Sequence, residues 1–121
     1  MDVLPDDALV VRGGQNMPDS FTQGSGVHIT TGGVLQDVSV NCGANLSVEE
    51  LTAPNALAGY PGIPHNRIDV TTVGAIRAAG GDVVSAPSRS NPHHSHLSGI
   101  TAEEASALFR PTVKNPTKAK P

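Results

Sequence analysis

Three of the five histidines of the chain stand within four positions, in the stretch NPHHSHLSGIT at 91–101. If this stretch is extended, His94 and His96 project from one face and His93 from the other. Three interpretations follow: a polar loop that leads into a helix, one histidine acting as general acid or base, or a metal site completed by a distant ligand. The chain lacks a cysteine pair and the HExxH spacing, both typical of zinc sites, so we expect no metal.

A fourth histidine, His65, follows a loop rich in proline and glycine over 53–64 and is followed by Asn66 and Arg67. These three residues supply a titratable group, a neutral hydrogen-bonding group and a fixed cation. Cleavage of a phosphodiester without metal needs a base near neutral pH, an acid, and a cation for the anionic transition state. The hypothesis is therefore that His65 and His94 form the acid–base pair, and an ordinary exposed loop histidine is the alternative.

Arg12 lies at the end of the β-branched run at 8–12 and is followed by two glycines. An arginine beside flexible backbone is suited to a bidentate hold on a phosphate or carboxylate. We expect Arg12 or Arg67 to hold the phosphate of an RNA-like substrate, and Asn66 and Thr72 to orient it. A surface ion pair with a nearby aspartate is the alternative role of Arg12.

The charge balance restricts the partners of the chain. Eight Lys and Arg stand against 11 Asp and Glu, for a net charge of −3, which argues against strong nonspecific binding to nucleic acid but allows a small basic cleft. A single cysteine excludes an internal disulfide. The N-terminal segment is acidic where a secretory signal would be basic, and no apolar run could span a membrane. We expect a soluble cytoplasmic protein with RNA or a protein as partner, no cofactor and no membrane contact.

Short strand patterns alternate with short helix patterns along the chain. Gly32 and Gly33 separate two strand-like runs, and such a connection is too short for a parallel crossover. Two capping boxes, at Ser47 and Thr101, predict helix starts. The expected strands are 8–12, 26–31, 34–40, 67–72, 82–87 and 96–100, and the expected helices are 47–51, 73–81 and 101–109. In the run 34–40, the face formed by Val34, Gln36, Val38 and Val40 should point inward.

These patterns predict one α+β domain at 1–112, with a mainly antiparallel sheet, two or three short helices and long ordered loops. A flexible tail rich in proline and lysine should follow at 113–121.

Three segments carry a resemblance to known proteins: VTTVGAIRAAGGDVV at 70–84, NPxHxxLSGIT at 91–101, and LFRPTVKNP at 108–116. They resemble small bacterial proteins and single-domain modules of the polymorphic-toxin kind, over most of residues 8–116. The positions that match are Arg12-Gly13-Gly14, Asn66, Thr71-Thr72, His94 and Ser98-Gly99. The resemblance implies a small bacterial effector or toxin-like enzyme.

Two other functions stay open. A non-catalytic module that binds or regulates a protein should have dispersed histidines and an exposed apolar patch around Leu57, Tyr60 and Ile63. The layout around Arg12 also resembles the start of ADP-ribosyltransferase-like folds. The glutamates of this chain all lie at predicted helix starts, where capping explains them, so the glutamate of that family has no clear counterpart.

Overall fold

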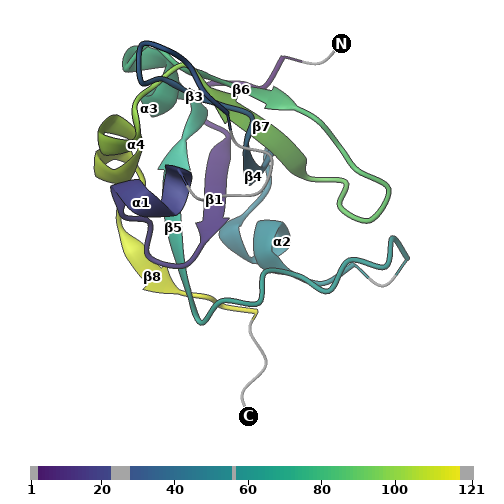
Figure 1. Ribbon diagram of the computed structural model, residues 1–121. Helices are drawn as coiled ribbons and strands as arrows, with labels where there is room; N and C mark the ends of the chain where they lie inside the picture. Colours follow the sequence, from purple (N-terminus) through teal and green to yellow (C-terminus); the bar gives the residue numbers. More distant parts are fainter. Residues whose placement is uncertain (1–2, 23–27, 56, 118–121) are drawn as a thin grey trace.

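A six-stranded antiparallel sheet, in the order β6-β7-β4-β1-β5-β8, runs through the computed structural model, which describes residues 3–22, 28–55 and 57–117 (Figure 1). Its strands are β1 (Leu9–Gly13), β4 (Val38–Gly43), β5 (Arg67–Thr72), β6 (Asp82–Ser85), β7 (His94–Ser98) and β8 (Thr112–Lys114). A separate pair joins β2 (His28–Ile29) to β3 (Leu35–Gln36). The helices are α1 (Pro18–Thr22), α2 (Val48–Thr52), α3 (Val73–Ala78) and α4 (Ala102–Leu108). The predicted α+β class with an antiparallel sheet is confirmed.

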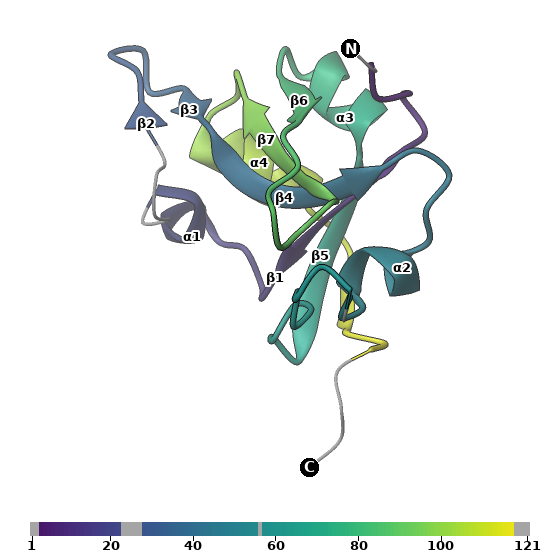
Figure 2. The ribbon, with the colours of Figure 1, turned by 90° about the vertical axis from the view of Figure 1, so that its right-hand side faces the viewer.

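Helices cover both faces of the sheet. Helices α1, α3 and α4 pack on one face, and α2 packs on the other (Figures 1 and 2). The larger core lies under α1, α3 and α4 and includes Phe21 and Phe109, whose ring centroids are 5.5 Å apart. The smaller core joins Leu51 of α2 to Val11 and Ile68 on the central strands. Within the described residues, no helix is long and apolar enough to cross a bilayer.

Both predicted capping boxes form, and they explain where α2 and α4 begin. The Ser47 hydroxyl accepts the Glu50 backbone N–H at 3.1 Å, and the Glu50 carboxylate accepts the Ser47 N–H. Thr101 and Glu104 make the same reciprocal pair. Each box satisfies N–H groups that the first turn of a helix leaves without partners. Local side-chain chemistry therefore defines these starts.

For the run 34–40, the prediction of which side chains point inward is wrong before the break at Asp37. The backbone of Asp37 has a φ of 60°, which ends β3 and lets β4 begin one residue later in the other sheet. The alternation of side chains changes phase at this break. As a result Leu35 is buried and Gln36 is exposed, whereas Val38 and Val40 are buried as predicted.

The structure also differs from the sequence prediction in two further segments. The run 13–20 was predicted only to interrupt the strands, but α1 forms at Pro18–Thr22 and buries Phe21. The expected tail from residue 113 instead continues the sheet, since β8 pairs with β5 and Asn115 is only 1% exposed. The last four residues, 118–121, lie outside the described residues.

Candidate functional site

Arg12 extends from β1 over the ring of Phe21, with its guanidinium carbon 4.8 Å from the ring centroid. Its N–H groups donate to the side-chain oxygen of Asn16 and, at 3.2 Å, to the backbone carbonyl of Ser20. Burial lowers the pKa of Arg12, and the nearby Asp69 carboxylate opposes this shift. An arginine stays protonated in proteins even so, and these contacts fix its position as a cation.

The buried Asp69 carboxylate organises the backbone next to Arg12. Asp69 is opposite Arg12 in the β1–β5 pairing and is fully buried. Its oxygens accept the backbone N–H of Asn16 at 2.6 Å, the hydroxyl of Thr112, and an N–H of Arg110 at 3.3 Å. The carboxylate thus shapes the turn after β1, which carries Asn16 back toward Arg12.

The imidazole of His65 lies against the bare backbone of Gly13 and Gly14. A Cβ built on Gly13 would overlap the ring, with His65 Cε1 at 2.9 Å. Asn115 holds the loop that carries His65, because its side-chain amide donates to the carbonyls of Ile63 and His65 at 2.9 Å each. The glycine pair therefore has a steric role, because it leaves room for this histidine beside Arg12.

Both ring nitrogens of His94 have partners. Nδ1 lies 2.9 Å from the carbonyl oxygen of Ala86, and Nε2 lies 3.0 Å from Ser39 Oγ. A carbonyl only accepts, so Nδ1 carries the proton and donates to Ala86. The neutral ring then has Nε2 as its acceptor, and the hydroxyl of Ser39 donates to it. His94 is in the tautomer that a general base at Nε2 requires.

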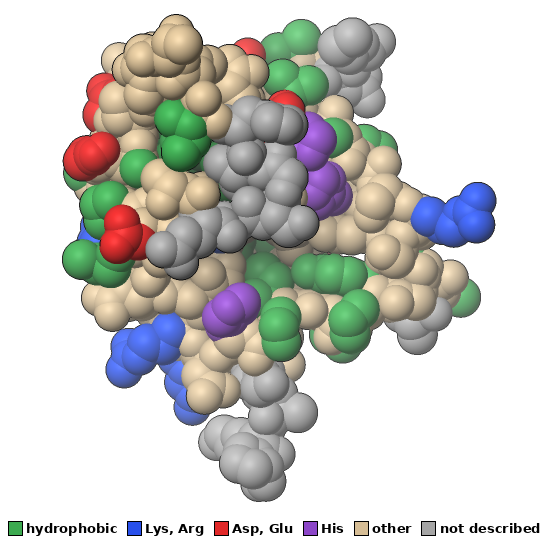
Figure 3. Space-filling model, in the orientation of Figure 1, with side chains coloured by type: hydrophobic (Ala, Val, Ile, Leu, Met, Phe, Trp, Pro, Cys, Tyr) green, Lys and Arg blue, Asp and Glu red, His purple; other side chains and the backbone are tan. Residues whose placement is uncertain are grey.

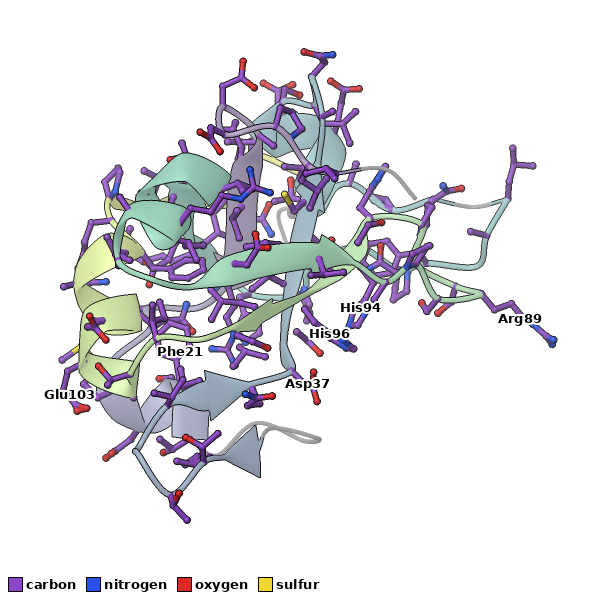
Figure 4. The ribbon with its side chains drawn as sticks, turned by 90° about the horizontal axis from the view of Figure 1, so that it is seen from above. Phe21, Asp37, Arg89, His94, His96 and Glu103 are labelled. Atoms are coloured by element: carbon purple, nitrogen blue, oxygen red, sulfur yellow. The ribbon has the colours of Figure 1, made fainter. Side chains whose placement is uncertain are left out.

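His94 and His96 share one face of β7, as the sequence predicts, and lie together in Figure 4. Their rings meet edge to face with centroids 5.0 Å apart. His96 Nδ1 is 3.9 Å from the Asp37 carboxylate, and this pair lies on the side of His96 away from His94 (Figure 4). The second histidine therefore packs against the first and limits its ring orientations.

Arg12, His65 and His94 come from three separate parts of the chain and line one pocket of about 270 Å³. A second pocket, of about 470 Å³, shares Arg12, Gly13 and His65 with the first. We call the two together the histidine cleft. Figure 3 shows histidine side chains at two places on one face of the molecule, with hydrophobic surface between them. Three predicted site residues therefore line one pocket, and the guanidinium of Arg12 itself lies over Phe21.

The described residues that line the histidine cleft do not include the other three predicted site residues, Asn66, Arg67 and Thr72. The hydroxyl of Thr72 accepts the N–H of Ala75 at 3.1 Å and caps α3, at the far end of β5 from Arg67. Arg67 is exposed, and its backbone lies opposite that of Lys114 on the edge strand β8. Asn66 is exposed and its carbonyl accepts the Asn115 N–H. Their geometry corresponds to structural roles.

Four polar residues that line the first pocket were not predicted as site residues: Ser39, Asn41, Tyr60 and Asn91. The buried amide of Asn41 donates to Tyr60 Oη at 3.0 Å and to the Leu51 carbonyl at 2.7 Å, and it accepts from Asn91 at 2.9 Å. This network connects β4 to the segment before β7. A polar residue at 41, directly after the apolar Val40, was the only sequence signal for it.

The described residues contain no group of three or more His, Cys, Asp or Glu side chains that could hold a metal ion. No family model, no curated protein and no solved structure matches this chain. Any function must therefore be inferred from the geometry of the histidine cleft.

Proposed function

We propose that the protein is a small enzyme that cleaves RNA phosphodiester bonds without a metal ion. The observation that carries the proposal is the convergence of Arg12, His65 and His94 on one pocket from β1, the long loop and β7. Two imidazoles and a guanidinium are the groups that this reaction needs. In a bacterial cell, such an enzyme would act on cellular RNA as a toxin-like effector.

His94 is the general base in this proposal. Its Nε2 accepts a proton from the ribose 2′-hydroxyl, which displaces the hydroxyl of Ser39 from that nitrogen. The 2′-oxygen attacks phosphorus, the bond to the 5′-oxygen breaks, and protonated His65 donates its proton to the leaving oxygen. Arg12 stabilises the charge on the phosphorane oxygens. The products are a 2′,3′-cyclic phosphate and a free 5′-hydroxyl.

The placement of the histidines favours an enzyme over a protein-binding module. The binding hypothesis requires dispersed histidines, but His65 and His94 line the same pocket. It also requires an apolar patch around Leu57. Leu57 is fully exposed, whereas Tyr60 and Ile63 are half-buried and face the cleft. The net charge of −3 counts against the proposal, which therefore requires the RNA to be bound at a local cleft.

The test uses a DNA oligonucleotide that contains one ribonucleotide between a fluorophore and a quencher, in buffer with EDTA. We expect cleavage at that position and a 2′,3′-cyclic phosphate by mass spectrometry. His65→Ala and His94→Ala should each lower the rate by about 10²–10⁴-fold, the usual contribution of a general acid or base. The all-deoxy oligonucleotide should stay intact because it lacks the 2′-hydroxyl.

His93→Ala is the matched control, since His93 is absent from the lining of the cleft. It should keep the rate within about twofold. Cleavage of the all-deoxy strand, or equal rates for His93→Ala and His94→Ala, would contradict the proposal.

A further inference from the structure

Ser39 and His94 form a hydrogen-bonded pair at the mouth of the cleft, and the RNA mechanism uses His94 but not Ser39. Ser39 Oγ lies 3.0 Å from His94 Nε2, and the Ala86 carbonyl orients the other ring nitrogen from 2.9 Å. A hydroxyl, a base and a third group that orients the base constitute the arrangement that activates a serine nucleophile. Among the described residues, this is the one serine that is hydrogen-bonded to a histidine ring.

The sheet holds this pair in place. Strands β4 and β7 are antiparallel, with Ser39 opposite His96 and Asn41 opposite His94. Ser39 and His94 are thus diagonal neighbours on one face, within reach of each other. His96 packs edge to face on the His94 ring and restricts its rotation. Two side chains on paired strands keep their relative geometry better than two on loops.

Tyr60 supplies a donor for a developing negative charge, because it lines the same pocket as Ser39 and His94. Tyr60 Oη accepts from the Asn41 amide, so its own proton points elsewhere and can be donated. Part of the remaining wall is apolar and includes Val11, Val40 and Ile63. A volume of about 270 Å³ suits a short aliphatic group.

We propose that Ser39 and His94 are a nucleophile–base pair that hydrolyses esters of short-chain carboxylic acids. Ser39 Oγ attacks the carbonyl carbon and its proton passes to His94 Nε2. The bond to the leaving alcohol breaks, and His94 returns the proton to the alkoxide, which leaves an acyl group on Ser39. Water then attacks this acyl group, gives a proton to His94, and Ser39 leaves with that proton. The net reaction converts an ester and water into an acid and an alcohol.

The test measures covalent capture of Ser39 by an alkyl fluorophosphonate, followed by intact-mass and peptide mass spectrometry, together with hydrolysis of p-nitrophenyl acetate and butyrate. We expect one label per chain, on Ser39, and turnover of both esters. Ser39→Ala should abolish the label, and His94→Gln should slow labelling at least about 100-fold, because the general base is lost.

Two variants serve as matched controls. Ser85→Ala removes an exposed serine on the adjoining edge strand β6, and His93→Gln removes a histidine that is absent from the lining of the cleft. Both should label within about twofold of the wild-type rate. Circular dichroism of Ser39→Ala and His94→Gln should match the wild type, which shows that any loss of label is not a loss of fold.

No label on the wild type, or a label that persists in Ser39→Ala, would overturn the proposal. Equal labelling of His94→Gln and the wild type would also overturn it, because Ser39 would then react without a base. The two proposals fail separately: Ser39→Ala should still cleave the ribonucleotide substrate, whereas His65→Ala should lose that cleavage and keep the label.

Discussion

At the scale of single residues, Gly13 determines where His65 can lie. The imidazole of His65 occupies the space that any side chain at position 13 would fill. The cost of a methyl group there is steric and local, since the atoms it would meet belong to the side chains of His65 and Ile63. The geometry of the cleft can therefore be disturbed without disturbing the sheet.

We expect Gly13→Ala to displace the His65 ring and to lower ribonucleotide cleavage at least tenfold, because misplacement by about 1 Å can cost two orders of magnitude. The free energy of unfolding should change by only about 1 kcal/mol. Cleavage rates, the NMR shift of the His65 ring and urea unfolding measure the three effects. Gly32→Ala is the control, because its nearest neighbour would be Thr30 Oγ1 at 3.8 Å. An unchanged His65 signal in Gly13→Ala would contradict the expectation.

The sequence predicted part of the cleft at this scale. The period of two along an extended strand was enough to place His94 and His96 on one face. Ser39 could not be found in this way, because it is 55 residues from His94 in the sequence and their contact depends on the register between β4 and β7. Thr72 was misplaced for a related reason: its hydroxyl caps α3, and a capping threonine has the same sequence context as one that binds an anion.

At the scale of elements, the contact between Phe21 of α1 and Phe109 after α4 closes the larger core. Both rings are fully buried, with centroids 5.5 Å apart and planes at 47°. These are the only two phenylalanines of the chain. The Phe21 ring also supports the Arg12 guanidinium, so this contact connects the core to the cleft.

We expect Phe109→Ala to reduce the free energy of unfolding by about 3–5 kcal/mol, the usual result of removing a buried aromatic ring. Urea unfolding followed by circular dichroism measures the loss. Leu57→Ala, at a fully exposed position, should change the same quantity by less than about 0.5 kcal/mol. A similar loss in both variants would show that the ring contact does not stabilise the core.

Elements whose boundaries depend on local chemistry were the most predictable. The capping boxes at Ser47 and Thr101 marked α2 and α4, and the β-branched runs marked β1 and β5. The five-residue α1 was missed because it is too short for a helical period to show. The division of the run 34–40 was missed because the positive φ of Asp37 is imposed by tertiary context.

At the scale of the whole molecule, stability should depend on pH through the buried thiol of Cys42. Burial raises the pKa of Cys42 from about 9 to about 11. The folded protein therefore holds this proton more tightly than the unfolded chain does. The stabilisation is complete below pH 9 and is lost as the pH rises toward 11.

The loss should reach about 2 kcal/mol at pH 11 and about 3 kcal/mol at full ionisation, as expected for a shift of two units. Urea unfolding of the wild type and of Cys42→Ala between pH 7.5 and 11 measures it. The difference in unfolding free energy between the two proteins should shrink as the pH rises, since other groups titrate equally in both. A constant difference would contradict the assignment.

The strand order has a consequence for the time at which the histidine cleft is completed during synthesis. The first strand, β1, lies in the interior of the sheet and pairs with β4 and β5, and β4 pairs in turn with β7 (Figure 2). Arg12 is made well before His94, which lies on the later strand β7. A ribosome-bound chain therefore carries an incomplete cleft until β7 has left the exit tunnel, and the proposed cleavage of RNA would have to wait until then.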